Sequence, residues 1–413
     1  MVKIEDLYLE IIKDSRGEDT LKATIQSGGF SASSSIPKGK SRGEKEAMLL
    51  PIEKVVINFE KIKPLIINQN FVSIKDFDDF LINLDGTPNK KKLGGNLTLV
   101  LSQAFARLIS KTNQKELYQT LEEEFFILNP ALEMKIKNNP YPYFFFNLLN
   151  GGKHAPYGPY LQEYLIIPQT INPKESLSLA IEFFQNLKIF IIQNYSQVKF
   201  GDEGGVLLPS NDYKEPLEIF SKIRKQMNLE EKILFGLDVA ASSFYNKEEK
   251  RYHLAPGYEL TSKDLLNLYL ELNNQYSFFS LEDPFEENDF ESFSKITKEI
   301  GERVLIIGDD LTVTNKEILK KAIDKNSINS LIIKPTQIGT VSETLITIGL
   351  AHREGIKPII SHRSAETDDD FIADLAIATK AYGLKAGAPQ PLERMVKYKR
   401  VIQIFNFKFP IFK

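Results

Sequence analysis

The segment ILFGLD (233–238) is the first of a series of short apolar runs that each end in a charged or hydroxyl side chain. The later runs are YSFFSLE (276–282), VLIIGD (304–309), SLIIK (330–334), KPIISH (357–362) and YGLK (382–385). Their final residues lie 44, 27, 25, 28 and 23 positions apart. Four of these five spacings have the length of one strand, one helix and two short loops. The series therefore predicts consecutive βα units of a parallel barrel.

The charged and hydroxyl residues at these run ends are expected to meet in one pocket, because the carboxyl ends of the strands of such a barrel surround a single site. They are Asp238, Glu282, Asp309, Lys334, Lys385, Ser361 and His362. Any one of the three acids alone is more often a helix cap or a surface charge. Three acids in the same register favour a functional pocket instead.

The three acids are candidate ligands of a metal ion. Carboxylates that share a pocket repel one another unless a divalent cation neutralises them. Oxygen ligands without sulfur favour Mg²⁺ over Zn²⁺. Asp238, Glu282 and Asp309 are therefore expected to bind Mg²⁺.

Lys334 would face the same pocket, with Lys385 nearby. A lysine acts as a general base only if its ammonium form is destabilised, and a metal ion and a second ammonium group both do that. The simpler alternative is a salt bridge between Lys334 and a neighbouring aspartate. The proline and glycine of KPTQIGT (334–340) favour a shaped loop at this strand end over a solvated face.

Four further segments have the composition of binding loops. SHRSAET (361–367) combines arginine, histidine and hydroxyl groups, which predicts an anion site. GDEGG (201–205) places Glu203 between glycines that let the backbone approach a ligand closely, although a tight turn with a capping acid explains it equally well. NGGKHAPYGPYLQEY (150–164) and PKGKSRGE (37–44) also contain several glycines, and each alone is weak support for a site.

The composition is that of a globular protein with a large core, since 42% of the 413 residues are apolar and 11% are aromatic. The 52 basic and 55 acidic side chains nearly balance, which argues against binding to nucleic acid or to an anionic membrane. The absence of cysteine excludes disulfides, thiolate metal ligands and cysteine nucleophiles. The N-terminal residues lack the pattern of a signal peptide, and no apolar stretch approaches the roughly 20 residues of a membrane span, so we expect a cytoplasmic protein.

Two domains are predicted. Residues 1 to about 60 alternate as antiparallel strands do, and helical patterns follow at 97–112 and 115–128, so the first domain is of the α+β class. A segment rich in proline and asparagine (129–144) marks a boundary near residue 135, which divides the chain into 1–135 and 136–413. In the second domain, helices are predicted at 261–275, 314–325 and 340–355.

Together, these motifs resemble the enolase family, the phosphopyruvate hydratases of glycolysis. They follow the family's order and cover nearly the whole chain. The strings are DSRG (14–17), NGGxH (150–154) with QE (162–163), GDEGG (201–205), DVAAS (238–242), LEDP (281–284), GDDLTVTN (308–315), KPTQIGT (334–340), SHRSAET (361–367) and KAGAP (385–389). The resemblance implies an α/β fold with an enolase-type (β/α)8 barrel, whose first units depart from simple βα alternation, preceded by a smaller α+β N-terminal domain.

The resemblance also implies the reversible, Mg²⁺-dependent dehydration of 2-phospho-D-glycerate to phosphoenolpyruvate. Lys334 matches the base that removes the C2 proton, and Glu203 matches the acid that helps the C3 hydroxyl leave. Glu163 matches an auxiliary acid. We expect Glu203 to be protonated when it acts, and we expect the neighbouring carboxylates to favour that form.

The resemblance implies two Mg²⁺ ions per active site and a homo-oligomer, a dimer or an octamer. Asp238, Glu282 and Asp309 match the ligands of a structural Mg²⁺. Ser41 matches a residue of a mobile loop that closes on a second Mg²⁺ bound with the substrate phosphate. The positions that match substrate contacts are Ser41, His154, Gln162, His362, Arg363, Ser364 and Lys385.

Several positions depart from the family pattern. The mobile loop, usually PSGASTG, is PKGKSRG (37–43) and gains three cations. The other changes are Pro156 and Pro159 in the second loop, Glu18–Asp19 after DSRG, Thr336 in place of asparagine, and Pro391–Leu392 before Glu393–Arg394. None of these changes removes a residue that is matched to the chemistry.

Two other functions remain open on the sequence. One is a binding or scaffold protein that keeps the fold while its loops no longer close, but the retained Lys334 and Glu203 speak against it. The other is a related enzyme, such as a racemase, that acts on a different carboxylate. The match at Ser41 and the strings GDEGG and SHRS disfavour that alternative.

Overall fold

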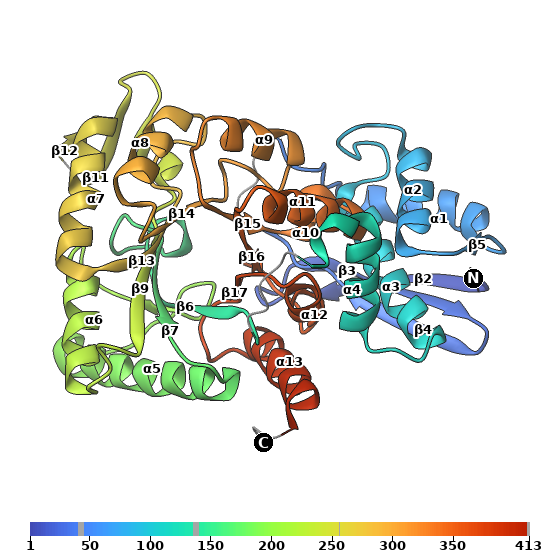
Figure 1. The fold of residues 1–413 in the computed structure, drawn as a ribbon, viewed down its shortest axis with the longest axis horizontal. Coiled ribbons are helices and arrows are strands. Elements are labelled where there is room, and N and C mark those ends of the chain that lie inside the picture. The colour runs from blue at the N-terminus through green and yellow to red at the C-terminus, as the bar shows by residue number, and fades with distance from the viewer. Residues whose placement is uncertain (40–44, 135–139, 256, 411–413) are drawn as a thin grey trace.

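The computed structural model describes residues 1–39, 45–134, 140–255 and 257–410. A smaller domain, formed by the N-terminal part of the chain, lies beside a larger barrel (Figure 1). The boundary expected near residue 135 falls outside the described residues, so the division into 1–135 and 136–413 stays a prediction. Among the helices described, none is long and apolar enough to cross a membrane.

The smaller domain contains the antiparallel sheet that the alternating pattern predicts. Strands β2 (Asp6–Lys13), β3 (Asp19–Ser27) and β4 (Phe30–Ser35) are hydrogen-bonded in that order. Gly28 and Gly29 join β3 to β4 with φ angles of 54° and 77°, which suit a two-residue hairpin turn. The predicted helices are present as α3 (Gly95–Thr112) and α4 (Leu117–Leu128). The domain also contains β1 (Val2–Lys3), β5 (Asn70–Phe71), α1 (Ile52–Ile66) and α2 (Ile74–Asp85).

Helix α3 joins the small sheet to the barrel. It is buried on almost all sides, because it packs on β3 and β4 and also on α10 (Pro335–Ile338) and α11 (Val341–Arg353) of the barrel. The Thr98 hydroxyl donates to the carbonyl of Gly339 at 2.7 Å across this contact. A helix buried all round belongs to a core. The two domains therefore share one continuous hydrophobic core.

Eight strands of the described residues form the barrel, and the six predicted runs supply six of them. The ring order is β6 (Tyr143–Asn150), β7 (Glu163–Pro168), β9 (Ile233–Asp238), β13 (Phe278–Glu282), β14 (Leu305–Gly308), β15 (Ser330–Ile333), β16 (Lys357–Ser361) and β17 (Gly383–Lys385). Strand β17 pairs in parallel with β6 and closes the ring.

The start of the barrel departs from simple βα alternation, as the resemblance to the enolase family implied. Strand β7 runs antiparallel to both of its neighbours, β6 and β9. The connection from β6 to β7 contains one short 3₁₀ helix and no α-helix, so nothing carries the chain back for a parallel return. Helices α5 (Pro173–Tyr195) and α6 (Glu215–Gln226) then follow before β9, while β8 (Val206–Leu207) pairs with β6 outside the ring.

The predicted helices of the barrel are α7 (Ser262–Tyr276), α9 (Lys316–Asp324) and α11. Thr261 and Thr340 cap α7 and α11, because each side chain accepts a backbone N–H of the first turn. The 44-residue spacing arises from a ribbon inserted after β9, which consists of β10 (Tyr245–Asn246), β11 (Arg251–Ala255) and β12 (Tyr258–Leu260). The remaining helices are α8 (Phe290–Ile300), α12 (Phe371–Ala378) and α13 (Leu392–Lys408).

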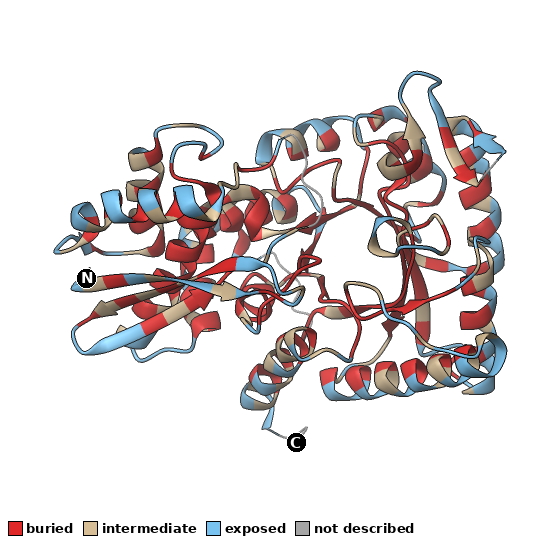
Figure 2. Ribbon diagram, turned by 180° about the vertical axis from the view of Figure 1, so that it is seen from behind, coloured by how far each residue is buried: buried red, intermediate tan, exposed pale blue. Residues whose placement is uncertain are grey.

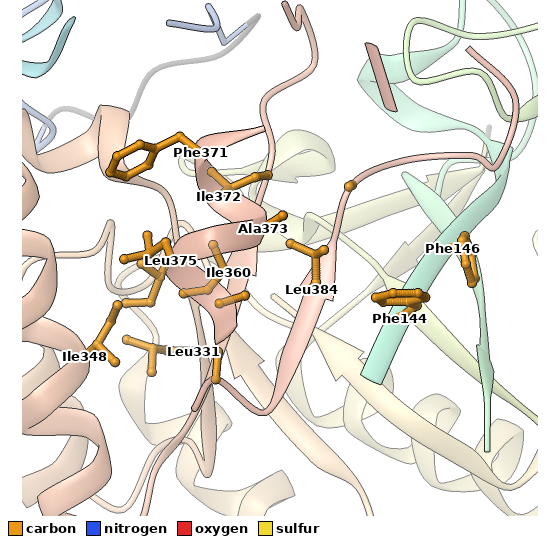
Figure 3. Close-up of a cluster of buried hydrophobic side chains, with 14 of the residues drawn as sticks. Phe144, Phe146, Leu331, Ile348, Ile360, Phe371, Ile372, Ala373, Leu375 and Leu384 are labelled. Carbon is orange, nitrogen blue, oxygen red and sulfur yellow. The ribbon is translucent and has the colours of Figure 1, made fainter. Parts of the chain in front are cut away.

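The barrel strands are buried on both faces, whereas the surrounding helices expose their outer sides (Figure 2). Alternate strand residues pack into one cluster inside the ring, and they are Phe145, Leu165, Ile167, Leu305, Ile307, Ile332 and Ile359. The residues between them face the helices, as Leu331, Ile360 and Leu384 do beside Leu375 of α12 (Figure 3). This inner cluster fills part of the barrel and leaves the carboxyl rim for polar groups.

The carboxylate of Asp78 links the two domains. It lies on α2, is fully buried, and accepts the backbone N–H of Ser342 in the first turn of α11 at 2.7 Å. Burial raises the pKa of Asp78 to about 7 from 3.8. An acid with a raised pKa in the folded state binds its proton more tightly when folded. It therefore stabilises the fold below about pH 4 and loses that contribution as the pH rises towards about 7.

We expect Asp78→Asn to stabilise the protein relative to wild type more at pH 8 than at pH 5. Asparagine keeps an acceptor for Ser342 and removes the buried charge. The difference between the two pH values amounts to at most about 3 kcal/mol, because about two pH units separate pH 5 from the pKa of about 7, at about 1.4 kcal/mol per unit. Urea unfolding at both pH values measures it. Asp79→Asn is the control, because it makes the same change at the half-exposed neighbouring position. Equal effects of Asp78→Asn at both pH values would contradict the prediction.

Candidate active site

The strand ends bring the predicted residues to one rim of the barrel. Asp238 and Glu282 are the last residues of β9 and β13 and lie in register with each other. Lys385 ends β17, and Asp309 and Lys334 directly follow β14 and β15. The expected convergence of these strand ends is therefore present in the structure.

Glu163 reaches the same rim from the opposite end of a strand. It is the first residue of β7 and pairs in register with Asp238, the last residue of β9. Because β7 is antiparallel, its amino end lies where the parallel strands have their carboxyl ends. The spacing of the apolar runs therefore could not find Glu163, and only the string QE (162–163) pointed to it.

A glycine-containing loop brings Glu203 to the rim. A Cβ atom added at Gly201 or Gly205 would lie 2.7 or 2.6 Å from Oδ1 of Asn150 at the end of β6. Any larger residue would push this loop outward, so the glycines of GDEGG allow Glu203 to lie close to the barrel.

Glu203 also lies near a histidine of the connection from β6 to β7. Nδ1 of His154 is 3.7 Å from Oε1 of Glu203.

Lys385 stands between three buried carboxylates. Its Nζ lies 2.9 Å from Asp238, 2.9 Å from Glu282 and 3.0 Å from Glu163. Burial disfavours the ammonium form, but the three negative charges outweigh burial and raise the pKa of Lys385 well above its usual range. Gln162 donates to Asp238 at 3.4 Å. Two of the three predicted metal ligands thus share one lysine in this structure.

Lys334 forms an ion pair with Asp309. Burial again opposes the charge, but Asp309 outweighs it and raises the pKa of Lys334. The salt bridge that was the simpler alternative for Lys334 is therefore present. Lys334 can act as a general base only if another group binds Asp309, because the ion pair with Asp309 keeps the pKa of Lys334 high.

The pKa values of the two predicted acids, Glu163 and Glu203, differ from our expectation that neighbouring carboxylates favour the protonated form of Glu203. Burial and the charge of Glu203 raise the pKa of Glu163 to about 7. Burial also acts to raise the pKa of Glu203, but His362, His154 and Arg394 outweigh it and hold this pKa well below its usual range. Neighbouring carboxylates thus favour the protonated form at Glu163, whereas the cations and N–H donors around Glu203 favour its ionised form.

Arg363 connects the pocket to the smaller domain. Its Nη1 lies 3.3 Å from Glu46 and donates to the Thr336 hydroxyl at 2.9 Å. A Cβ atom at Gly39 would lie 1.9 Å from Nη2 of Arg363, so any larger residue there would require the guanidinium group to move. Thr336, one of the departures from the family pattern, therefore supplies a direct hydrogen bond to a predicted substrate contact.

The segment that precedes Ser41 lies against the barrel. Lys38 and Ala365 exchange backbone hydrogen bonds at 2.9 and 3.1 Å. The Lys38 side chain pairs with Glu18 at 2.9 Å, so two departures from the family pattern neutralise each other. This pair is about half exposed and contributes less than about 1 kcal/mol. Ser41 lies outside the described residues, as Lys40 and Arg42 do, so its role stays a prediction.

The other predicted residues line one pocket, except Glu282, which does not line it but accepts a hydrogen bond from Nζ of Lys385 at 2.9 Å. Those that line it are His154, Gln162, Glu163, Glu203, Asp238, Asp309, Lys334, His362, Arg363, Ser364 and Lys385. Sequence reasoning gave no role to Glu46, Asp283, Asp310 and Gln337, which also line it. Asp283 and Asp310 stand within the strings LEDP and GDD, which could have pointed to them. Glu46 comes from the other domain and had no such signal.

The pocket holds more carboxylates than its lysines and arginines neutralise. Burial and the neighbouring acids raise the pKa values of Glu282 and Asp283 well above their usual range and that of Asp310 to about 7. Ligand atoms of Asp283, Asp309 and Asp310 lie within 4.8 Å of one another, as do those of His154, Glu163 and Glu203. An oxygen-rich set of donors with surplus negative charge fits a hard divalent cation.

Comparison with known proteins agrees with the two-domain fold. The family model for the N-terminal domain of enolase matches residues 4–121, and that for the enolase C-terminal TIM barrel domain matches residues 138–407. The chain is 38% identical to the enolase of Sulfurisphaera tokodaii over 408 residues, which is 96% of this chain and 94% of the relative. It is 36% identical to the enolase of Elusimicrobium minutum over 416 residues, 98% of this chain and 96% of the relative. The chain therefore belongs to the enolase family, the phosphopyruvate hydratases among the lyases.

Proposed function

We propose that this protein interconverts 2-phospho-D-glycerate and phosphoenolpyruvate in glycolysis with Mg²⁺ as its cofactor. The observation that carries the proposal is the meeting of Lys334, Glu203 and the buried carboxylates around one pocket. Membership of the enolase family supports the same reaction. It also supports a cytoplasmic homo-oligomer, a dimer or an octamer, as a further part of the proposal.

We assign Lys334 as the base that removes the C2 proton and Glu203 as the acid that protonates the leaving C3 hydroxyl. Loss of the C2 proton places a second negative charge on the substrate's carboxylate, so cations must face that group. Lys385 and Arg363 are buried cations of the same pocket, and we assign them, with His154, Gln162, His362, Ser364 and Ser41, to substrate contacts.

Glu203 needs a proton before it acts, although its pKa is low in this structure. A phosphorylated substrate brings several negative charges into the pocket, and these raise the pKa of a neighbouring carboxyl. Glu163, with a pKa of about 7, and His154 lie beside Glu203 and are the groups that can share a proton with it. We therefore keep Glu163 as the auxiliary acid.

We assign Asp238, Glu282 and Asp309 as the ligands of one Mg²⁺, and Ser41 as a ligand of a second. The surplus of buried carboxylates supports a divalent cation at this rim. When bound, Mg²⁺ supplies positive charge that stabilises the carboxylate oxygens of the substrate as C2 loses its proton. Asp309 would then no longer neutralise Lys334, and the pKa of Lys334 would fall towards the range of a base.

The test is incubation of the purified protein with 2-phosphoglycerate and Mg²⁺, with phosphoenolpyruvate followed by its ultraviolet absorbance. We expect absorbance to rise with both components present and to stay constant without either. A folded protein that gives no signal in saturating Mg²⁺ would contradict the proposal. A racemase would instead act on a different carboxylate, and a chiral assay of candidate carboxylates detects that activity.

A further inference from the structure

Arg394 of α13 is a fully buried arginine beside the proposed active site. Among the described residues, the carboxylate within ion-pair distance of it is Glu393, which lies 3.9 Å from Nε and is beyond hydrogen-bond range. Burial of a charge is costly unless hydrogen bonds compensate it. The hydrogen bonds of the guanidinium group therefore indicate the role of Arg394.

The guanidinium group ties together two loops of the pocket. Nη1 donates to the carbonyl of Arg363 at 2.7 Å, and Nη2 donates to the carbonyl of Ser364 at 2.7 Å. Nη2 also donates to the carbonyl of Asp202 at 3.2 Å. Arg394 thus fixes the loop of Arg363 against the loop that carries Glu203.

The same group determines which nitrogen of His362 carries the proton. Nη1 of Arg394 lies 2.5 Å from Nδ1 of His362. A guanidinium group has N–H donors and no acceptor, so Nδ1 must be the unprotonated nitrogen. The proton of the neutral ring then resides on Nε2, which lies 3.3 Å from Oε2 of Glu203. Burial, with Arg394 as a further cause, lowers the pKa of His362 to about 4, which agrees with a neutral ring.

This tautomer gives the two oxygens of Glu203 different surroundings. Oε2 faces the Nε2–H of His362 and also accepts from Asn147 at 3.0 Å. Oε1 faces His154 at 3.7 Å, which is too long for a hydrogen bond. Within the described residues, Oε2 is therefore held by two donors, whereas Oε1 accepts no hydrogen bond and is available for proton transfer.

We propose that Arg394 is a positioning residue that keeps His362 in its Nε2-protonated tautomer and so selects Oε1 of Glu203 as the oxygen that faces the C3 hydroxyl. The effect on catalysis rests on the proposed function, whereas the tautomer does not. In the other tautomer, an imidazole lone pair would face the Glu203 carboxylate and an N–H would face the N–H of Arg394. Both contacts are repulsive.

The tautomer can be measured in the wild-type protein, which has four histidines. Nitrogen-15 NMR distinguishes the protonated from the unprotonated ring nitrogen, and His362→Gln identifies the signals of His362 by their loss. We expect His362 to keep Nε2 protonated and Nδ1 unprotonated between about pH 6 and pH 8, around the ordinary histidine pKa. A protonated Nδ1 in this range would overturn the proposal, whatever the activity of the protein.

Three variants separate positioning from mere structural support. Arg394→Met is expected to release His362 from this tautomer. By analogy with the removal of an outer partner that orients a metal-binding histidine, kcat should fall by roughly 10- to 100-fold, with a smaller change in KM. Arg394→Lys restores a donor and should recover the tautomer and part of kcat. Arg400→Met, a control on the same helix where the guanidinium bonds Asp374 and Glu116, should leave the tautomer unchanged. A folded Arg394→Met protein with the wild-type tautomer would overturn the proposal.

Discussion

Replacement of Lys334 with alanine is expected to lower kcat by roughly 10²- to 10⁴-fold or more, because a general base contributes a factor in that range. The variant loses the only function that we assign to this side chain, removal of the C2 proton. The measurement is phosphoenolpyruvate formation from 2-phosphoglycerate, together with exchange of the C2 proton for deuterium in heavy water. The variant should lose both.

Lys325→Ala is the matched control, because it removes an exposed lysine of the preceding loop. It should leave turnover and exchange unchanged. Circular dichroism of both variants verifies that they are folded. Exchange at the wild-type rate in Lys334→Ala would exclude Lys334 as the base and would direct attention to the other buried lysine, Lys385.

Asp309→Asn is expected to raise the Mg²⁺ concentration needed for half-maximal activity by at least 10-fold, the lower end of the effect seen for outer partners of metal ligands. The amide is a weaker oxygen donor and carries no charge, and it also leaves the Lys334 ammonium without its partner. Activity as a function of Mg²⁺ and calorimetric titration with Mg²⁺ in the absence of substrate both report the change.

Asp324→Asn, at an exposed position on α9, is the control with an unchanged Mg²⁺ requirement. Addition of a chelator should abolish the wild-type activity and excess Mg²⁺ should restore it. If Asp309→Asn needed no more Mg²⁺ than wild type, Asp309 would not be a metal ligand. The neighbouring acids Asp283 and Asp310 would then be the candidates, since their carboxylates lie within 4.8 Å of that of Asp309.

The strands and helices of the barrel were predictable where the pattern was local. Runs such as SLIIK (330–334) have their apolar residues within a few positions of one another, and each run ends at a residue that was predicted to lie at the rim of the barrel. The caps of α7 and α11 were predictable for the same reason, because a threonine and the backbone that it caps lie three residues apart. The motifs added the family and named 11 of the residues that line the pocket.

The direction of β7 was not predictable from these patterns. Its apolar run, EYLIIP, is as strand-like as the others, and its direction depends on the lack of a helix between it and β6. That single reversal brings Glu163 beside Asp238. The packing of Glu46 against Arg363 likewise joins residues that are hundreds of positions apart in the sequence.

By itself, the sequence determined the barrel, the polar rim and the residues available for chemistry, because apolar periodicity and motif strings act over a few neighbouring residues. Only the tertiary structure decided the charge state of those residues. Glu163 and Glu203 are both buried acids, yet one has a raised and the other a lowered pKa. The difference arises because a pKa depends on the distance to charges and donors such as Arg394, and those distances exist only after the chain has folded.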